Sequence, residues 1–274
     1  MSDAKQIVAF GGFDDIRSFD LRFFEEASKL GEMTVLVWPD DLIQQTTGVP
    51  PKFSLAERVY LLNALRYVTR VVPLAGWAET DSLPALPGVH KEIWVDVEAS
   101  ANPKREEFCR EHGIAYRVLS AHELSGFPEP LTTPSTPGKR KVIVSGSYDW
   151  LHSGHVRFLE EASNYGDLYA VVGHDANIRL LKGAGHPLLP QGERRYVVGS
   201  IKYVKQALIS TGDGWLDADP DIRRLKPDLY VVNEDGDQGG KREYCQKLGI
   251  EYLVLKRVPA QGLPQRSSTE LRGF

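Results

Sequence analysis

Apolar positions along the chain follow two kinds of pattern. Short runs that are mostly apolar and rich in β-branched or aromatic residues predict buried strands. Residues 155–163 instead place Val156, Leu159 and Ala162 three positions apart, which predicts the apolar face of a helix, and Gly166 is predicted to end it. Because strands and helices alternate, the pattern predicts βαβ units around a parallel sheet. The clearest strand-like runs are residues 7–10, 34–38, 142–144 and 168–172.

This order of elements occurs twice in the sequence. Residues 11–32 and 146–167 align at an offset of 135 positions and are identical at 10 of 22 positions. With one inserted residue the register continues, so that even Cys109 aligns with Cys245. A repeat of this length indicates two copies of one fold in tandem.

A segment without apolar periodicity separates the two copies. Residues 123–140 are rich in proline, threonine and glycine, a composition typical of an extended linker. We therefore predict an α/β protein with two tandem Rossmann-like domains, each built on a parallel sheet. The predicted parts are a first domain at residues 1–127, a linker at 128–139 and a second domain at 140–274.

The two copies differ where the first strand leads into the first helix. The aligned pairs that change chemical character there include Arg17 and His152, Phe19 and Gly154, and Asp20 and His155. His152 and His155 are three positions apart at the predicted helix start, so both lie on one face of the helix. Two imidazoles beside the helix N-terminal amides predict an anion site, such as one for phosphate. A zinc site would need further ligands, and the sequence places no third ligand beside the pair.

Composition narrows the function classes. The 33 Lys and Arg residues against 37 Asp and Glu residues give a net charge of −4, which argues against broad binding to nucleic acid. Two cysteines are too few for a disulfide framework or a thiolate metal site. No apolar run is long enough to predict a membrane span, and the start of the sequence resembles no secretory signal, so we expect a cytoplasmic protein.

Residues 146–155 carry a family resemblance. Their sequence, GSYDWLHSGH, resembles the GTFDxxHxGH signature of the cytidylyltransferase-like superfamily. Its members join a nucleoside triphosphate to a phosphomonoester and release pyrophosphate. The tandem arrangement is similar to that of the phosphoethanolamine cytidylyltransferases. Further matches follow in the same order along the chain: the segment from Asp175 to Lys182 and Gly183, then Glu193 and Arg194, then residues 200–204, then Arg257 and residues 266–270.

The resemblance implies a role for each matching residue. His152 and His155 would contact the α- and β-phosphoryl oxygens, Lys182 would neutralise charge between the donor and acceptor phosphates, and Arg194 would orient the nucleotide or the acceptor. The residues implied to bind the nucleotide are Gly146, Ser147, Tyr148, Asp149, Gly154, Asp175, Arg257, Ser268 and Thr269. Those expected near the acceptor are Lys202, Trp215 and Asp235, although core packing explains one tryptophan, and a turn explains one acidic segment, equally well.

The resemblance also implies an activity. We expect transfer of CMP from CTP to a small phosphomonoester of the phosphoethanolamine, phosphocholine or glycerol 3-phosphate class. Mg²⁺ is expected to be bound mainly through the nucleotide phosphates, with Asp149 or Asp175 as the only protein ligands that can be named. An ATP-dependent adenylyltransferase of the same superfamily and a non-catalytic nucleotide-binding protein are the alternatives. The first copy, which lacks the histidines, is expected to be a degenerate domain that pairs with the second in a pseudo-twofold, intramolecular pseudo-dimer.

Overall fold

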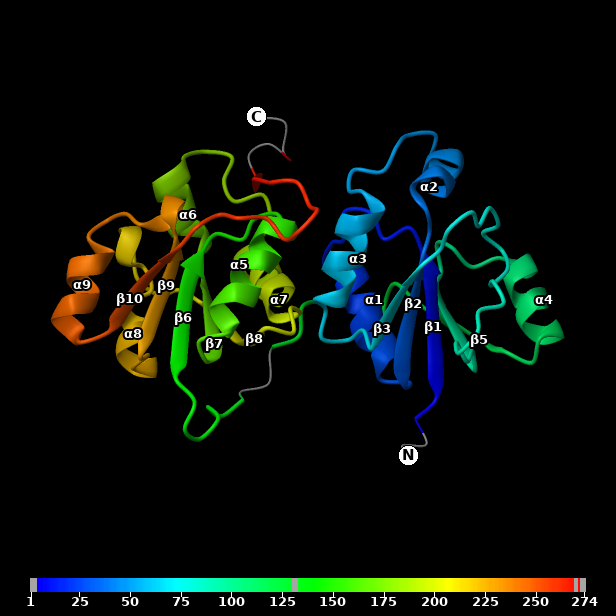
Figure 1. Cartoon of the computed structure of the whole chain (residues 1–274), viewed down its shortest axis with the longest axis horizontal. Coiled ribbons are helices and arrows are strands. Elements are labelled where there is room, and N and C mark those ends of the chain that lie inside the picture. The colour runs from blue at the N-terminus through cyan, green and yellow to red at the C-terminus, as the bar shows by residue number, and fades with distance from the viewer. Residues whose placement is uncertain (1–3, 130–132, 269–270, 272–274) are drawn as a thin grey trace. The chain divides into compact units, whose positions relative to one another are not determined.

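The computed structural model describes residues 4–129, 133–268 and 271 of the chain. The chain divides into two compact units, Met1–Gly126 (unit 1) and Phe127–Phe274 (unit 2) (Figure 1). The described residues of the predicted linker, 128–129 and 133–139, lie in neither a helix nor a strand. The roles that we assign to the two predicted domains remain predictions.

Unit 1 is built on a parallel sheet whose described strands lie in the order β3-β2-β1-β4-β5. Helices connect the strands, as expected for βαβ units, except between β3 and β4. The strands are β1 (Gln6–Gly11), β2 (Glu32–Val37), β3 (Arg70–Pro73), β4 (Ile93–Val97) and β5 (Ala115–Leu119), and the helices are α1 (Ser18–Ser28), α2 (Asp40–Thr47), α3 (Leu55–Asn63) and α4 (Pro103–Glu111).

Unit 2 repeats this topology, with described strands in the order β10-β9-β6-β7-β8. Two short 3₁₀ turns follow its strands β8 and β9. The strands are β6 (Lys141–Gly146), β7 (Asp167–Val172), β8 (Val204–Ile209), β9 (Leu229–Asn233) and β10 (Glu251–Leu255). The helices are α5 (Ser153–Ser163), α6 (Asp175–Lys182), α7 (Gln191–Gly199), α8 (Asp219–Leu225) and α9 (Lys241–Leu248), and the 3₁₀ turns are η1 (Gly214–Leu216) and η2 (Glu234–Gly236).

The structure confirms the α/β fold class with parallel sheets. The four predicted runs fall on β1, β2, β6 and β7, and only Trp38 lies beyond the end of its strand. On α5, Val156, Leu159 and Ala162 are fully buried, because this face of the helix packs toward the sheet. No helix among the described residues has the length and apolar content that crossing a membrane requires.

Gly166 has a different role from the predicted one. Helix α5 ends at Ser163, and its C-cap is Asn164 in a right-handed conformation, so Gly166 does not cap the helix. A Cβ atom on Gly166 would lie 2.2 Å from the carbonyl oxygen of Arg140, just before β6. Glycine is required there because the two backbone segments approach so closely. The aligned glycine of unit 1, Gly31, faces the carbonyl oxygen of Lys5 in the same way.

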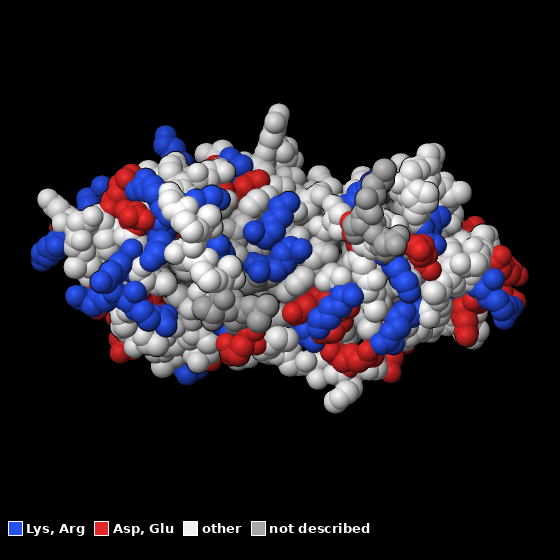
Figure 2. All heavy atoms as spheres, turned by 90° about the horizontal axis from the view of Figure 1, so that it is seen from below, with Lys and Arg blue, Asp and Glu red and all other residues white. Residues whose placement is uncertain are grey.

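The topology of unit 2 fixes where a ligand can enter. From the central strand β6 the chain adds β7 and β8 on one side, and it then crosses to add β9 and β10 on the other. In an open parallel sheet, ligands bind at the carboxyl ends of the strands where the order reverses, which here is between β6 and β9. On the face shown in Figure 2, basic and acidic side chains are interspersed, as the nearly balanced charge composition leads one to expect.

Candidate functional site

Two stacked histidines stand at the start of α5, beside the carboxyl end of β6. His152 is the N-cap of the helix, and its Nδ1 accepts a hydrogen bond of 3.1 Å from the backbone N–H of Gly154. The rings of His152 and His155 are nearly parallel, with their centroids 3.9 Å apart. A Cβ atom on Gly154 would lie 3.0 Å from the ring of His152. Glycine at this position therefore leaves room for the stacked ring.

Both histidines are held in their neutral form. Burial, together with the positive charges of Arg257 and Arg266, lowers the pKa of His152 to about 4. Burial, the neighbouring His152 and Lys182 lower the pKa of His155 as well. Because Nδ1 of His152 is an acceptor, the single proton of this ring lies on Nε2. His152 can therefore offer an N–H donor to an anion at the start of α5.

Cationic side chains from distant segments lie close to this pair. Lys182, at the end of α6, donates from Nζ to the hydroxyl of Ser147 at 2.8 Å. Burial and the charge of Arg194 lower the pKa of Lys182, whereas Asp235 opposes this change. Arg257 donates from Nη2 to the carbonyl oxygen of Arg266 at 3.0 Å, which ties the segment after β10 to itself. The site thus combines neutral donors with positive charge, as a polyphosphate requires.

A narrow cleft opens beside the histidines, at the switch point between β6 and β9. One face of α5 forms one wall, and the segment after β10 forms the other. Asn233, the last residue of β9, also lines it and begins the acidic segment that the sequence analysis considered, although Asn233 itself was not among the predicted site residues. Its position directly after a buried apolar run next to the central strand was the available signal. The lining residues are Gly154, Arg157, Phe158, Glu161, Asn233, Lys256, Arg257, Val258, Pro259, Gln265 and Arg266.

The structure does not place Arg194 where a substrate can reach it. Its side chain is fully buried, and each of its guanidinium nitrogens donates to the protein. The acceptors are the carbonyl oxygens of Leu189, Ser147 and Gly173 and the carboxylate of Asp175. The predicted direct role in orienting the nucleotide or acceptor is therefore replaced by a structural one. Arg194 joins the loops that follow the strands.

The two aspartates named as metal ligands are also engaged by the protein. Asp149 is buried, and its carboxylate accepts backbone N–H bonds from Leu188 and Leu189 at 2.8 to 3.0 Å. Asp175 pairs with Arg194 at 2.7 Å. Among the described residues, no group of three or more His, Cys, Asp or Glu side chains is placed to hold a metal ion.

Unit 1 contains the same framework without the histidines. Arg58 is fully buried and donates to the carbonyl oxygens of Phe53 and Gly12 and to Asp40. Asp14 accepts the backbone N–H groups of Lys52 and Phe53, as Asp149 accepts those of Leu188 and Leu189. Both units keep the buried arginine and the aspartate that accepts two backbone N–H groups. We therefore assign these hydrogen bonds to stabilising the fold and not to a reaction.

At the start of α1 in unit 1, the charged side chains bond to groups of the protein itself. Asp20, aligned with His155, accepts the backbone N–H of Arg17 at 2.8 Å. The side chain of Arg17, aligned with His152, pairs with Asp15 at 2.8 Å. A carboxylate therefore stands where unit 2 offers an imidazole. An anion at this helix start would meet negative charge.

Two of the predicted acceptor residues lie at the carboxyl edge of the sheet in unit 2. Asp235 in η2 pairs with Arg257 at 3.0 Å, so its carboxylate is already next to a cation. Trp215 in η1 is 47% exposed, and its ring covers Gly239, where a Cβ atom would lie 2.2 Å from the Trp215 side chain. The ammonium of Lys241 lies 5.8 Å from the centre of the same ring.

The structure does not bring Lys202 to this edge. Lys202 comes just before β8, and the amino ends of parallel strands lie at the opposite edge of the sheet from the carboxyl ends. Its neighbour Tyr203 bonds to Glu160, which is near the end of α5 rather than its start. The predicted acceptor role of Lys202 is therefore not supported by its position.

The remaining predicted residues lie near the last described segment and the first loop. Ser268 is helical, and the N–H of Leu271 donates to the carbonyl oxygen of Ser267 at 3.2 Å, so a helical turn begins here. Thr269 lies outside the described residues.

In the loop after β6, Gly146 ends the strand, and Ser147 follows it with its hydroxyl toward Lys182. Tyr148 is buried, with its ring centroid 5.4 Å from that of His155.

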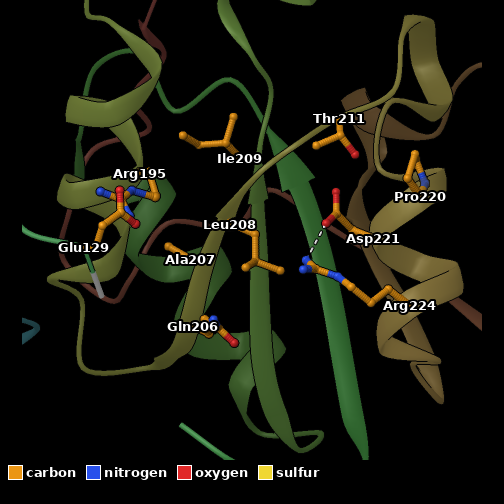
Figure 3. A pocket seen from close by; sticks show the side chains of 10 residues that line it. All are labelled: Glu129, Arg195, Gln206, Ala207, Leu208, Ile209, Thr211, Pro220, Asp221 and Arg224. Atoms are coloured by element: carbon orange, nitrogen blue, oxygen red, sulfur yellow. Dashed lines mark hydrogen bonds and ion pairs between the residues drawn. The ribbon is translucent and has the colours of Figure 1, made fainter. Parts of the chain in front are cut away.

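A separate cavity of about 500 Å³ lies along the edge strand β8 (Figure 3). Arg195 and Asp221 stand on opposite sides of it. Arg195 pairs with Glu129, and Asp221 pairs with Arg224 at 2.8 Å. Of the predicted substrate-binding residues that the structure describes, none lines this cavity. The residues predicted to bind phosphate lie instead near the start of α5.

Comparison with known proteins identifies the family. The model of the cytidylyltransferase-like family matches residues 143–273. FAD synthase of Ferroglobus placidus is 35% identical over 120 residues, which are 43% of this chain and 75% of that protein. FAD synthase of Pyrococcus horikoshii is 39% identical over 136 residues, which are 48% of this chain and 88% of that protein. This chain belongs to the cytidylyltransferase-like family. It is a nucleotidyltransferase of that superfamily.

The comparisons correct the predicted activity. Relatives that are matched over most of their own length are named FAD synthase, so the expectation of CTP and a small phosphomonoester was wrong. The alternative, an adenylyltransferase of the same superfamily, fits these names better.

The Bifunctional protein HldE of Nitratiruptor sp. is 38% identical over 122 residues, which are 44% of this chain but only 25% of that protein.

Proposed function

We propose that unit 2 is an ATP-dependent adenylyltransferase that transfers AMP to the phosphate of FMN and so forms FAD and pyrophosphate. The observation that carries the proposal is the pair of stacked, neutral histidines at the start of α5, beside the ammonium of Lys182. The choice of ATP and FMN is supported by the relatives named FAD synthase, since FAD is FMN joined to AMP.

The reaction needs positioning and charge stabilisation more than covalent chemistry. An oxygen of the FMN phosphate attacks the α-phosphorus of ATP, and the bond from that phosphorus to the oxygen bridging the α- and β-phosphates breaks. The electron pair leaves with pyrophosphate. Negative charge grows on the α-phosphoryl oxygens and on the departing group. In this proposal the Nε2–H of His152 and the ring of His155 donate to these oxygens, beside the positive end of the α5 helix dipole.

In this scheme the ammonium of Lys182 interacts with two phosphates, that of FMN and the α-phosphate of ATP. Its Nζ lies 2.8 Å from the Ser147 hydroxyl, directly after β6, and therefore stands on the β6 side of the helix start. The ammonium there offsets the repulsion between the phosphate of FMN and the α-phosphate of ATP. The lowered pKa of Lys182 returns toward its ordinary value when these anions bind, because they favour the charged amine.

Mg²⁺ would be held mainly by the phosphates of ATP and by water. This mode of binding leaves Asp149 and Asp175 in the hydrogen bonds that they accept from the protein. The ion would neutralise triphosphate charge that otherwise opposes attack. The role of unit 1 remains structural in this proposal, and its pairing with unit 2 in a pseudo-twofold arrangement stays a prediction.

The test measures pyrophosphate release and the flavin product with the full chain. We expect release from ATP with FMN, formation of FAD by chromatography, and at least a hundredfold loss of kcat in His155→Ala (about the effect of removing one transition-state donor). His122→Ala, which alters an exposed histidine of unit 1, is the matched control and should keep full activity. Release from CTP alone would contradict the proposal. ATP binding without release from any acceptor would favour a non-catalytic protein.

A further inference from the structure

Tyr148 and Phe13 occupy the same position in the two units. Both residues have a left-handed backbone, with φ of +48° and +49°. Both rings lie against the glycine that ends the first strand, since a Cβ atom on Gly146 would be 3.0 Å from Tyr148 and one on Gly11 would be 3.1 Å from Phe13. The strained backbone and the ring packing therefore come with the fold. Only the hydroxyl of Tyr148 is specific to the unit with the histidines.

The hydroxyl of Tyr148 is buried and has no partner among the described residues. Tyr148 is 4% exposed, and its hydroxyl makes no hydrogen bond with any residue in the part of the chain that the structure describes. An unpaired buried hydroxyl is unfavourable, and a phenylalanine fits the same position in unit 1 at no such cost. The nearby hydroxyl of Tyr230 shares a 2.5 Å hydrogen bond with Ser145 and makes none with Tyr148.

A second unpaired polar atom lies on the neighbouring ring. The ring centroids of Tyr148 and His155 are 5.4 Å apart. Nδ1 of His155 is buried and has no hydrogen-bond partner among the described residues, while a hydrogen bond from this ring to the backbone carbonyl of Trp150 raises the pKa of His155 against the larger effect of burial. Two polar atoms without a partner among the described residues thus lie on neighbouring rings.

His152 shows what such a bond would achieve. Its Nδ1 accepts from the backbone N–H of Gly154, which leaves the ring proton on Nε2. His155 lies within the first turn of α5, where the N–H groups of His155 and Val156 donate to the carbonyl oxygen of His152, so an equivalent donor has to come from outside the helix backbone. We propose that Tyr148 is a positioning residue whose hydroxyl donates to Nδ1 of His155, directly or through one buried water, and fixes the ring proton on Nε2.

The consequence is a matched pair of donors. With Nδ1 occupied on both rings, His152 and His155 would each present an Nε2–H toward the oxygens of a bound polyphosphate. The inference rests on the proposed function only for the identity of the anion. The tautomer of His155 is a property of the protein alone and can be observed without turnover.

The test is Tyr148→Phe in the full chain, a change that unit 1 already accommodates at Phe13. Nitrogen-15 NMR of the histidine rings, with His155→Ala to assign the signal, reports which ring nitrogen carries the proton. We expect a single Nε2–H tautomer of His155 in the wild-type chain and a mixture or the other tautomer in Tyr148→Phe. We also expect kcat to fall about tenfold with KM for ATP nearly unchanged, the effect of one hydrogen bond.

Tyr244→Phe is the matched control, because it removes a phenol that bonds Asp219 on the outer helices of the same unit. It should change neither the tautomer nor kcat. An unchanged His155 tautomer in Tyr148→Phe would overturn the inference, whatever happens to activity. A changed tautomer in a chain that releases no pyrophosphate under any condition would uphold the inference while the proposed function failed.

Discussion

Nη2 of Arg194 lies 2.7 Å from Oδ1 of Asp175, and in unit 1 the aligned Arg58 makes the same ion pair with Asp40 at 2.5 Å. Comparing the two units of this chain therefore separates conserved structural contacts from residues that only unit 2 carries. A feature present in both units serves the fold, whereas a feature confined to unit 2 is open to a chemical role. By this criterion Arg194 is structural, and His152, His155 and Lys182 are specific to the second unit.

The first prediction concerns Arg194→Met. The change leaves three carbonyl oxygens and a carboxylate without their donor, so we expect unit 2 to lose about 3 kcal/mol of stability. Urea unfolding followed by a probe in each unit measures it, since two units need not unfold together. Arg58→Met should lower the stability of unit 1 by a similar amount. An Arg194→Met chain with unchanged stability and lost activity would restore the direct catalytic role.

The second prediction concerns Gly154→Ala. Alanine favours the helix by about 1 kcal/mol over glycine, but its Cβ would lie 3.0 Å from the His152 ring and would displace it. We expect kcat to fall at least tenfold while thermal stability stays within a few degrees. Gly192→Ala, in α7 with open space around its Cβ position, is the control and should keep full activity. Equal activities of the two variants would show that the stacked geometry does not matter.

The parts of the fold that the sequence predicts are those that burial imposes. Apolar runs mark β6 and β7 because both faces of a central parallel strand are covered, and the spacing of Val156, Leu159 and Ala162 marks the buried face of α5. Gly166 shows the limit of local patterns. Its neighbour is the carbonyl oxygen of Arg140, 26 positions away, so no local signal distinguishes this close approach from a helix cap.

The site was predicted less completely, for physical reasons. Whether Arg194 faces substrate or the interior depends on burial, although its retention as Arg58 in the copy without histidines was a usable signal. Lys202 precedes an apolar run, and this order alone places it at the amino edge of the sheet. The wrong choice of CTP has a different cause. The recognised histidines and lysine bind phosphates, which every nucleoside triphosphate shares.

The third prediction concerns pH. The pKa of His152 is about 4 in the folded chain and 6.5 ordinarily, so the unfolded chain binds more protons between these values. The stability linked to the neutral ring is therefore complete above about pH 6.5 and is lost as pH falls toward 4, by on the order of 2 kcal/mol at pH 5.

Urea unfolding at pH 7 and pH 5 measures this loss, and His152→Gln separates it from the carboxylates that titrate in the same range. Glutamine cannot gain a proton, so the variant should lose less stability than the wild-type chain between the two pH values. The same difference in both chains would show that His152 titrates normally in the folded state.

The fourth prediction compares two lysines at opposite edges of one sheet. Lys182 ends α6 beside Ser147, whereas Lys202 lies before β8 with its ammonium 5.5 Å from the ring centre of Tyr203. If the ammonium of Lys182 stabilises the transferring phosphate, Lys182→Gln should lower kcat about a hundredfold, because a charge acts most strongly where new charge develops. Lys202→Gln should leave kcat within twofold, since that side chain is far along the strands from the helix start. Steady-state kinetics of pyrophosphate release at saturating ATP and FMN distinguishes them. Equal losses in both variants would mean that net charge, rather than the position of Lys182, governs the rate, and this result would remove Lys182 from the reaction centre.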